Sequence, residues 1–165
     1  MKSLTNISIS LILFVSLTMP LPVFGQFANS PDVASPMLPK AFVLADFEEI
    51  SEKYAPEYQH LLDACDGNLD KAFEKWLEML TEMERESKKQ KINLSGVKMW
   101  MQVYFDESGG IDHIGFFLKP NSKNIDQRDL RVFLEKFARS YQFPITANSK
   151  YTHYTTVSFP VYADN

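Results

Sequence analysis

The sequence predicts an α+β fold in which helices precede a β-β-α-β unit. From Asp46 to Lys91 apolar residues recur at the spacing of amphipathic helices, whereas after Gly96 they alternate with period two. One more helical stretch separates the second alternating segment from the last one. Since a right-handed crossover places the last strand beside the first, we expect a three-stranded antiparallel sheet with strand order 2-1-3.

Length and charge narrow the function classes. The chain has 165 residues, which suits one domain with an appendage, and a formal net charge of −4. A nucleic-acid-binding protein needs a concentrated basic surface to neutralise phosphates, so this charge argues against that class. The single cysteine, Cys65, excludes an intramolecular disulfide and, within a helical pattern, is typical of a small buried residue.

Residues 1–25 are typical of a cleavable signal peptide. Lys2 supplies the positive charge, an apolar run follows, and Val23-Phe24-Gly25 offers a cleavage site before Gln26. The run is about 11 residues long, shorter than the roughly 20 that a membrane helix needs, so cleavage is favoured over an uncleaved anchor. We therefore expect a periplasmic or secreted protein with no stable membrane insertion after cleavage.

Two segments separate the signal peptide from the predicted sheet domain. Residues 26–45, with their spaced prolines, are predicted to form a flexible arm, and residues 46–91 a helical segment. Asp46 is the expected N-cap of the first helix, and Asn68 caps a long helix that reaches about Gln90. The apolar stripe of this long helix is expected to pack on the sheet domain and contains Leu69, Phe73, Trp76, Leu77, Leu80 and Met83.

Residues 96–162 form the predicted sheet domain. Alternation predicts strands from Val97 to Phe105 and from Ile111 to Lys119, joined by a hairpin turn. A capped helix from Asp126 to Tyr141 and a last strand from Tyr151 to Val161 complete the unit.

The register of the hairpin follows from its apolar face. Pairing Met101 with Ile114 places the apolar residues of both strands on one side of the sheet. Ile111 and Ile114 have opposite parity along the strand, so burying both requires an extra residue. We therefore predict a β-bulge near Asp112.

The segment from Val97 to Val161 combines an alternating strand, a hairpin at Phe105–Ile111, a helix ending in Tyr141-x-Phe143-Pro144 and a closing Phe159-Pro160-Val161. This pattern resembles the C-terminal domain of the TonB family of energy transducers. The resemblance implies that an edge strand accepts an extended peptide through backbone hydrogen bonds. TonB proteins keep an N-terminal anchor and a long Pro-rich spacer, whereas this chain is expected to lose its apolar segment. Energy transduction is therefore not expected.

The chain is also similar to exported proteins of Bacteroidota. The segments that support this similarity are Asp63–Asn68, Gly96–Trp100, Leu118–Ser122 and His153-Tyr154. The resemblance implies export and agrees with the boundaries given above, but it implies no activity.

The last strand is the predicted binding edge. The crossover leaves one of its sides unpaired, and no proline interrupts it before Pro160. We expect it to pair with a protein or peptide partner, unless the arm segment Phe42-Val43-Leu44 or a second copy of the chain covers it. The candidate residues of this edge are Tyr151, His153, Thr155, Val157 and Phe159.

A second candidate surface is aromatic. On the other face of the predicted sheet, alternation gathers Trp100, Tyr104, Phe117 and Tyr154. A large aromatic patch is either covered by another element or forms an interface. We expect the helices of residues 46–91 to cover this face or to extend the core, and any part left open to bind a partner.

Catalytic and metal-binding motifs are missing from the sequence. None of the three histidines stands at metal-ligand spacing from another ligand, and no nucleophile or phosphate-loop motif is present. We therefore expect a protein-binding module, not an enzyme, without a cofactor. Two alternatives stay open: a small hydrolase or other enzyme with a site around His113 and His153, and a carrier of a small apolar ligand.

Overall fold

The computed structural model describes residues 37–161. The predicted signal peptide, its cleavage site before Gln26 and the first part of the predicted arm lie outside the described residues. The strands of the described part form one mixed sheet in the order β1-β4-β3-β5-β2. They are β1 (Ala41–Val43), β2 (Gln59–His60), β3 (Lys98–Phe105), β4 (Ile111–Leu118) and β5 (Tyr151–Ser158).

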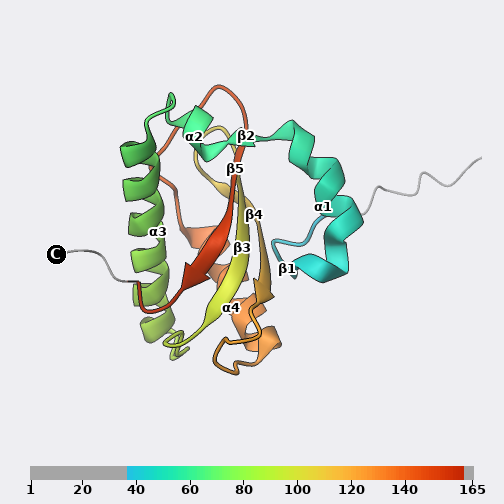
Figure 1. Cartoon of the computed structure of the whole chain (residues 1–165), viewed down its shortest axis with the longest axis vertical. Coiled ribbons are helices and arrows are strands. Elements are labelled where there is room, and N and C mark those ends of the chain that lie inside the picture. The colour runs from blue at the N-terminus through green and yellow to red at the C-terminus, as the bar shows by residue number, and fades with distance from the viewer. Residues whose placement is uncertain (1–36, 162–165) are drawn as a thin grey trace, which may run out of the picture. The chain divides into compact units, whose positions relative to one another are not determined.

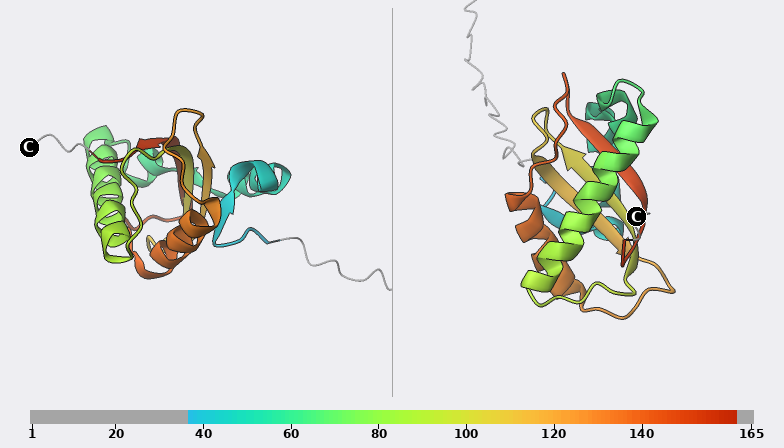
Figure 2. Two further views of the ribbon diagram at one scale, coloured as in Figure 1. Left: turned by 90° about the horizontal axis from the view of Figure 1, so that it is seen from below. Right: turned by 90° about the vertical axis from the view of Figure 1, so that its left-hand side faces the viewer.

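Helices cover both faces of this sheet (Figures 1 and 2). The long helix α3 (Leu69–Lys89) and α4 (Gln127–Ser140) lie on one face, here called the core face. The other face, here called the outer face, carries the segment with α1 (Glu48–Tyr54). The remaining helical turns are η1 (Leu44–Phe47), η2 (Ala55–Glu57) and α2 (Leu61–Ala64).

The expected three-stranded antiparallel sheet with order 2-1-3 is wrong. β3 does pair antiparallel with β4 and β5, but β1 adds to β4 and β2 adds to β5, both in parallel. The two added strands have three and two residues. Strands this short show no alternation in the sequence, so only their place beside longer strands identifies them.

The described end of the predicted arm is an ordered part of the sheet. Leu38 and Phe42 are buried, and Phe42 lies opposite Gly115 of β4. Because β1 pairs with β4, this segment lies at the edge of the sheet opposite to β5. The Phe42-Val43-Leu44 segment therefore does not cover β5.

Residues 44–58, here called the strap, cross the outer face from one edge of the sheet to the other. β1 and β2 hold its two ends at opposite edges, and Tyr58 at its end packs on Tyr104 with ring centroids 5.0 Å apart. The predicted N-cap at Asp46 is wrong, since Asp46 lies within η1 and α1 begins at Glu48 without a side-chain cap.

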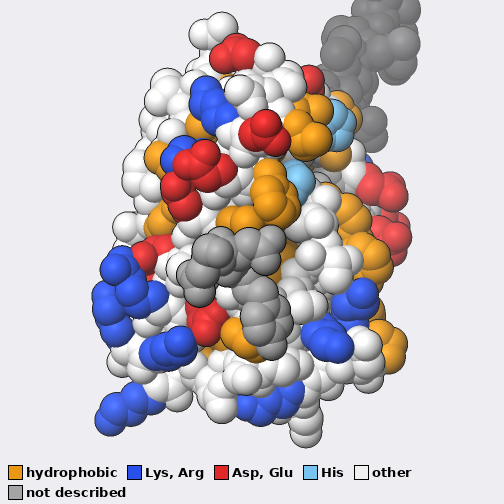
Figure 3. All heavy atoms as spheres, turned by 60° about the vertical axis from the view of Figure 1, so that its left-hand side comes forward, with side chains coloured by type: hydrophobic (Ala, Val, Ile, Leu, Met, Phe, Trp, Pro, Cys, Tyr) orange, Lys and Arg blue, Asp and Glu red, His pale blue; other side chains and the backbone are white. Residues whose placement is uncertain are grey.

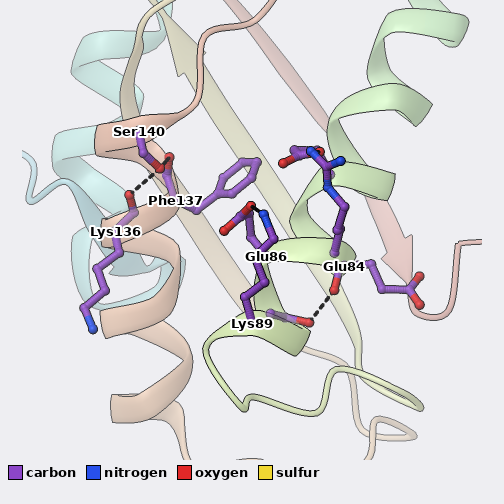
Figure 4. A network of polar contacts seen from close by, with 9 residues as sticks. Glu84, Glu86, Lys89, Lys136, Phe137 and Ser140 are labelled. Atoms are coloured by element: carbon purple, nitrogen blue, oxygen red, sulfur yellow. Dashed lines mark hydrogen bonds and ion pairs between the residues drawn. The ribbon is translucent and has the colours of Figure 1, made fainter.

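The core face holds the main hydrophobic core. Asn68 caps α3 as predicted, accepting a hydrogen bond from the Lys71 amide at 2.9 Å. The ring of Phe137 points from α4 toward α3 (Figure 4). Residues buried between the two helices and the sheet include Trp76, Met79, Met83, Phe133, Phe137, Met99, Met101, Phe116 and Val157, and Cys65 is also buried.

The hairpin has the predicted bulge but a different register. Tyr104 lies opposite His113 and Phe105 opposite Ile111, so Asp112 is the extra residue. Met101 pairs with Phe116, two positions from the predicted Ile114. The loop of residues 106–110 and the extra residue Asp112 together shift the pairing by two positions along β4. A shift of two keeps every side chain on its predicted face.

Candidate functional site

The outer edge of β5 is covered only at its beginning. β2 pairs with Tyr151 and Thr152, and no other strand of residues 37–161 pairs with this side of β5. From His153 to Ser158 the strand therefore has one backbone edge with no strand beside it. The prediction that all of this strand is a free edge is wrong for its first two residues.

Hydrogen bonds at both ends of β5 show which backbone groups face outward. The Gln59 amide donates to the Lys150 carbonyl at 3.0 Å from the β2 side, and the Phe159 amide donates to the Val97 carbonyl at 2.9 Å from the β3 side. Backbone groups alternate between the two sides of a strand. The N–H and C=O groups of Tyr154 and Thr156 consequently face away from the sheet.

The five candidate edge residues alternate along the strand with Tyr154 and Thr156. They direct their backbone groups toward β3 and their side chains toward the core face. Those that are buried are Tyr151, Val157 and Phe159, and those that are half-buried are His153 and Thr155. Alternation in the sequence shows which side chains share a face, but not which backbone N–H and C=O groups point to the open edge. That depends on the side of β5 on which β3 forms its hydrogen bonds.

A groove lined mainly by apolar side chains, here called the apolar groove, lies beside this open edge. Its volume is about 520 Å³, and α2, the first turns of α3 and β5 form its walls. Leu69 and Phe73, which were expected to be buried, are 69% and 61% exposed. Figure 3 shows hydrophobic and histidine side chains together on this side of the molecule. The lining residues are His60, Leu61, Leu62, Asp63, Leu69, Ala72, Phe73, Trp76, His153 and Tyr154.

The candidate aromatic face is divided by the strap. Tyr104 is fully buried beneath Tyr58, whereas Trp100, Phe117 and Tyr154 are exposed. The rings of Trp100 and Tyr154 are nearly parallel, with centroids 5.8 Å apart. The Lys119 ammonium lies 4.9 Å from the Trp100 ring centroid. The open part of this face is therefore an aromatic surface that already holds one cation.

A second groove, here called the aromatic groove, separates these exposed rings from the strap. It has a volume of about 390 Å³, and the Glu48 and Glu52 side chains of α1 lie along it. Tyr154 lines both this groove and the apolar groove, so the two meet at the edge of β5. The residues that line the aromatic groove are Leu44, Ala45, Glu48, Ser51, Glu52, Trp100, Gln102, Phe117 and Tyr154.

The two histidines of the enzyme alternative lie on opposite faces of the sheet. His113 pairs with Tyr104, whose side chain is on the outer face, and His153 pairs with Val103, whose side chain is on the core face. β3 therefore separates their imidazoles, and they do not form a common site.

Each of these histidines has its own environment. His113 Nδ1 lies 3.0 Å from the Pro39 carbonyl, and burial lowers its pKa. The His153 ring packs edge-to-face on Trp76 at 4.5 Å, and burial, followed by the nearby His60, lowers its pKa.

A small polar cluster ties the strap to the hairpin. Tyr58 donates a hydrogen bond to the Asp112 carboxylate at 3.2 Å, and Lys150 pairs with the same carboxylate at 3.2 Å. Burial, and then the Asp112 charge, raises the pKa of Tyr58. Each member has a partner, so this cluster is structural. Within residues 37–161 no group of three or more His, Cys, Asp or Glu side chains is arranged to hold a metal ion.

Comparisons with known proteins find no family model, no curated protein and no solved structure that matches this chain. None of the helices between residues 37 and 161 has the length and apolar character needed to cross a bilayer. The open edge of β5 and the two grooves beside it are therefore the features that indicate a function.

Proposed function

We propose that this protein is an exported binding module that takes up an extended segment of a partner protein along the outer edge of β5. The observation that supports this is the outward-facing backbone of Tyr154 and Thr156, which lies between two grooves. A bound segment would continue the line of β2 and add a strand to the sheet.

The composition of the edge favours pairing. Soluble proteins usually protect an edge strand with proline, with charged residues or with a covering element. Between His153 and Ser158 there is no proline, lysine or acidic residue, and three of the six residues are Thr or Val. β1, which could have covered the edge, pairs with β4 on the other side of the sheet.

The walls of the apolar groove supply a second contribution. Leu62, Leu69 and Phe73 are exposed although they belong to helices whose other apolar residues are buried or half-buried. Burial of such side chains by a partner is favourable at about 25 cal/mol per Å² of apolar surface. Backbone pairing would set the path of the segment, and these side chains would add affinity.

The enzyme alternative required His113 and His153 to lie in one site, but they lie on opposite faces of the sheet. We therefore keep the binding module as the proposed function.

The proposal is tested with a display library of short random peptides, panned on the protein recovered after expression of the full chain. Dissociation constants of enriched peptides are then measured for the wild type, for Thr156→Pro and for Thr156→Val. Proline removes an outward N–H that forms no bond within the sheet, so we expect about tenfold weaker binding. Valine keeps the N–H and the β-branched shape, so we expect binding within about twofold of the wild type.

Thermal unfolding of both variants shows whether the fold is intact. The Thr156 amide is not part of the ladder with β3, so the proline variant should keep a cooperative transition close to that of the wild type. Enriched peptides that bind folded Thr156→Pro as tightly as the wild type would contradict the proposal. A library that yields no binder would contradict it as well.

A further inference from the structure

Resting on this proposed function, we infer that the partner segment alternates apolar and basic side chains, with arginine or lysine at every second position. The inference follows from the two grooves, which have different chemistry and lie on opposite faces of β5 at the same edge.

Strand geometry assigns each position of the partner to one groove. Successive side chains of a strand point to opposite faces of its sheet, and directly opposed residues of neighbouring strands share a face. A partner residue beside His153 therefore points to the core face, where the apolar groove lies. The next residue, beside Tyr154, points to the outer face and toward the aromatic groove.

The position on the core face requires an apolar side chain. His153 lines the apolar groove there, and the ring of Trp76 packs on its imidazole at 4.5 Å. Phe73 and Leu62 form the exposed walls. A charged partner side chain would lose its hydration against these groups, and among residues 37–161 Asp63 is the one acidic residue that lines the groove.

The position on the outer face favours a cation. Glu48 and Glu52 line the aromatic groove, and neither forms an ion pair with a basic side chain of residues 37–161. From Asp46 to Glu57 the strap has five acidic residues and one basic residue. Acidic charge therefore predominates on the strap side of the aromatic groove, and an acidic partner residue beside Glu48 and Glu52 would be repelled.

The exposed rings add a second preference for a cation. The face of an aromatic ring attracts ammonium and guanidinium groups, and Lys119 already lies in this way against Trp100. A long basic side chain that starts beside Tyr154 can extend along its ring toward Trp100 while its charge meets Glu48 or Glu52. Arginine suits the groove best, because its planar group stacks on rings and pairs with carboxylates.

The test uses the enriched peptides described above and protein variants that change one groove each. Glu48→Gln combined with Glu52→Gln removes the charge from the aromatic groove, and Glu49→Gln removes an exposed charge of the same helix that does not line it. Phe73→Ser changes the apolar groove, and Val132→Ser changes an exposed apolar residue on α4.

We expect enriched peptides to show basic residues at alternate positions. Replacing these residues by glutamine should weaken binding to the wild type about tenfold, and binding to the Glu48→Gln, Glu52→Gln protein about twofold or less. Higher salt should weaken wild-type binding more than binding to this double variant. Phe73→Ser should weaken binding about tenfold, whereas Glu49→Gln and Val132→Ser should leave it within about twofold.

The outcomes separate this inference from the proposed function. The inference alone would be overturned by peptides that bind Thr156→Pro more weakly than the wild type but have no alternating basic residues. Such peptides would also bind the Glu48→Gln, Glu52→Gln protein as tightly as the wild type. Peptides whose affinity does not depend on Thr156→Pro would overturn the proposed function, whatever their charge pattern.

Discussion

Tyr154 combines three properties that matter for the proposed site. Its side chain is 55% exposed, it lines both grooves, and its backbone faces the open edge of the sheet. An exposed tyrosine on a strand contributes little to the core, so its burial by a partner strand would be a net gain for binding. This residue is the point where the backbone and side-chain parts of the proposed site meet.

We expect His113 and His153 to make the stability of the protein depend on pH. Burial lowers the pKa of both imidazoles in the folded chain. The unfolded chain, with an ordinary histidine pKa of about 6.5, then binds more protons, so the free energy of unfolding should fall as pH drops below about 6.5. Denaturant titrations between pH 8 and pH 5 measure this fall.

Substitution by glutamine identifies the contribution of each histidine. His113→Gln and His153→Gln should each reduce the dependence on pH, because glutamine does not titrate in this range. A pH dependence that stays unchanged in both variants would mean that neither histidine causes it.

Among the secondary-structure elements, the β3–β4 hairpin has a turn in which Gly109 has no room for a larger residue. Gly109 has φ +92°, and a Cβ there would lie 2.1 Å from the Phe143 carbonyl oxygen and 2.8 Å from that of Ile145. Gly109→Ala should therefore lower the free energy of unfolding by about 3 kcal/mol or more, through backbone strain and displacement of the segment after α4.

Gly67 provides the matched control for this substitution. It also has positive φ, at +75°, but nothing lies within 4 Å of its Cβ position. Gly67→Ala should cost only the strain of the left-handed conformation, about 1–2 kcal/mol. Equal losses of stability in the two variants, measured by denaturant unfolding, would show that the close contacts of Gly109 do not matter.

Helix α3 shows why an apolar stripe does not by itself identify a core. Its residues Leu69 and Phe73 continue the same stripe as Trp76 and Leu80, yet they are exposed. Periodicity predicts which side chains share a helix face, but not how far the surface under that face extends. The first turns of α3 lie beside the open edge of β5, where no strand of residues 37–161 covers them.

For the molecule as a whole, the predicted export would decide in which compartment the proposed site meets a partner. We predict that the exported protein begins at Gln26, because Val23-Phe24-Gly25 follows a short apolar run. Intact mass of the protein recovered outside the cytoplasm measures this directly. A full-length product that remains in the membrane fraction would contradict the prediction.

The sequence by itself determined the elements that are long enough to show a period, and the faces on which their side chains lie. Alternation grouped Trp100, Phe117 and Tyr154 on one face, and the opposite parity of Ile111 and Ile114 predicted the bulge at Asp112. These features are local, because strand geometry relates each residue to its neighbours in the chain.

Only the tertiary structure decided which edge of the sheet is open. β1 and β2 have too few residues to show a period. Their pairing depends on how the strap between them crosses the sheet and places each one beside a longer strand. The pairing of β5 with β3 directs the backbone groups of Thr155 and Val157 inward and leaves those of Tyr154 and Thr156 facing outward. Pairing between segments distant in sequence depends on the packed arrangement of the whole chain, and no local pattern contains it.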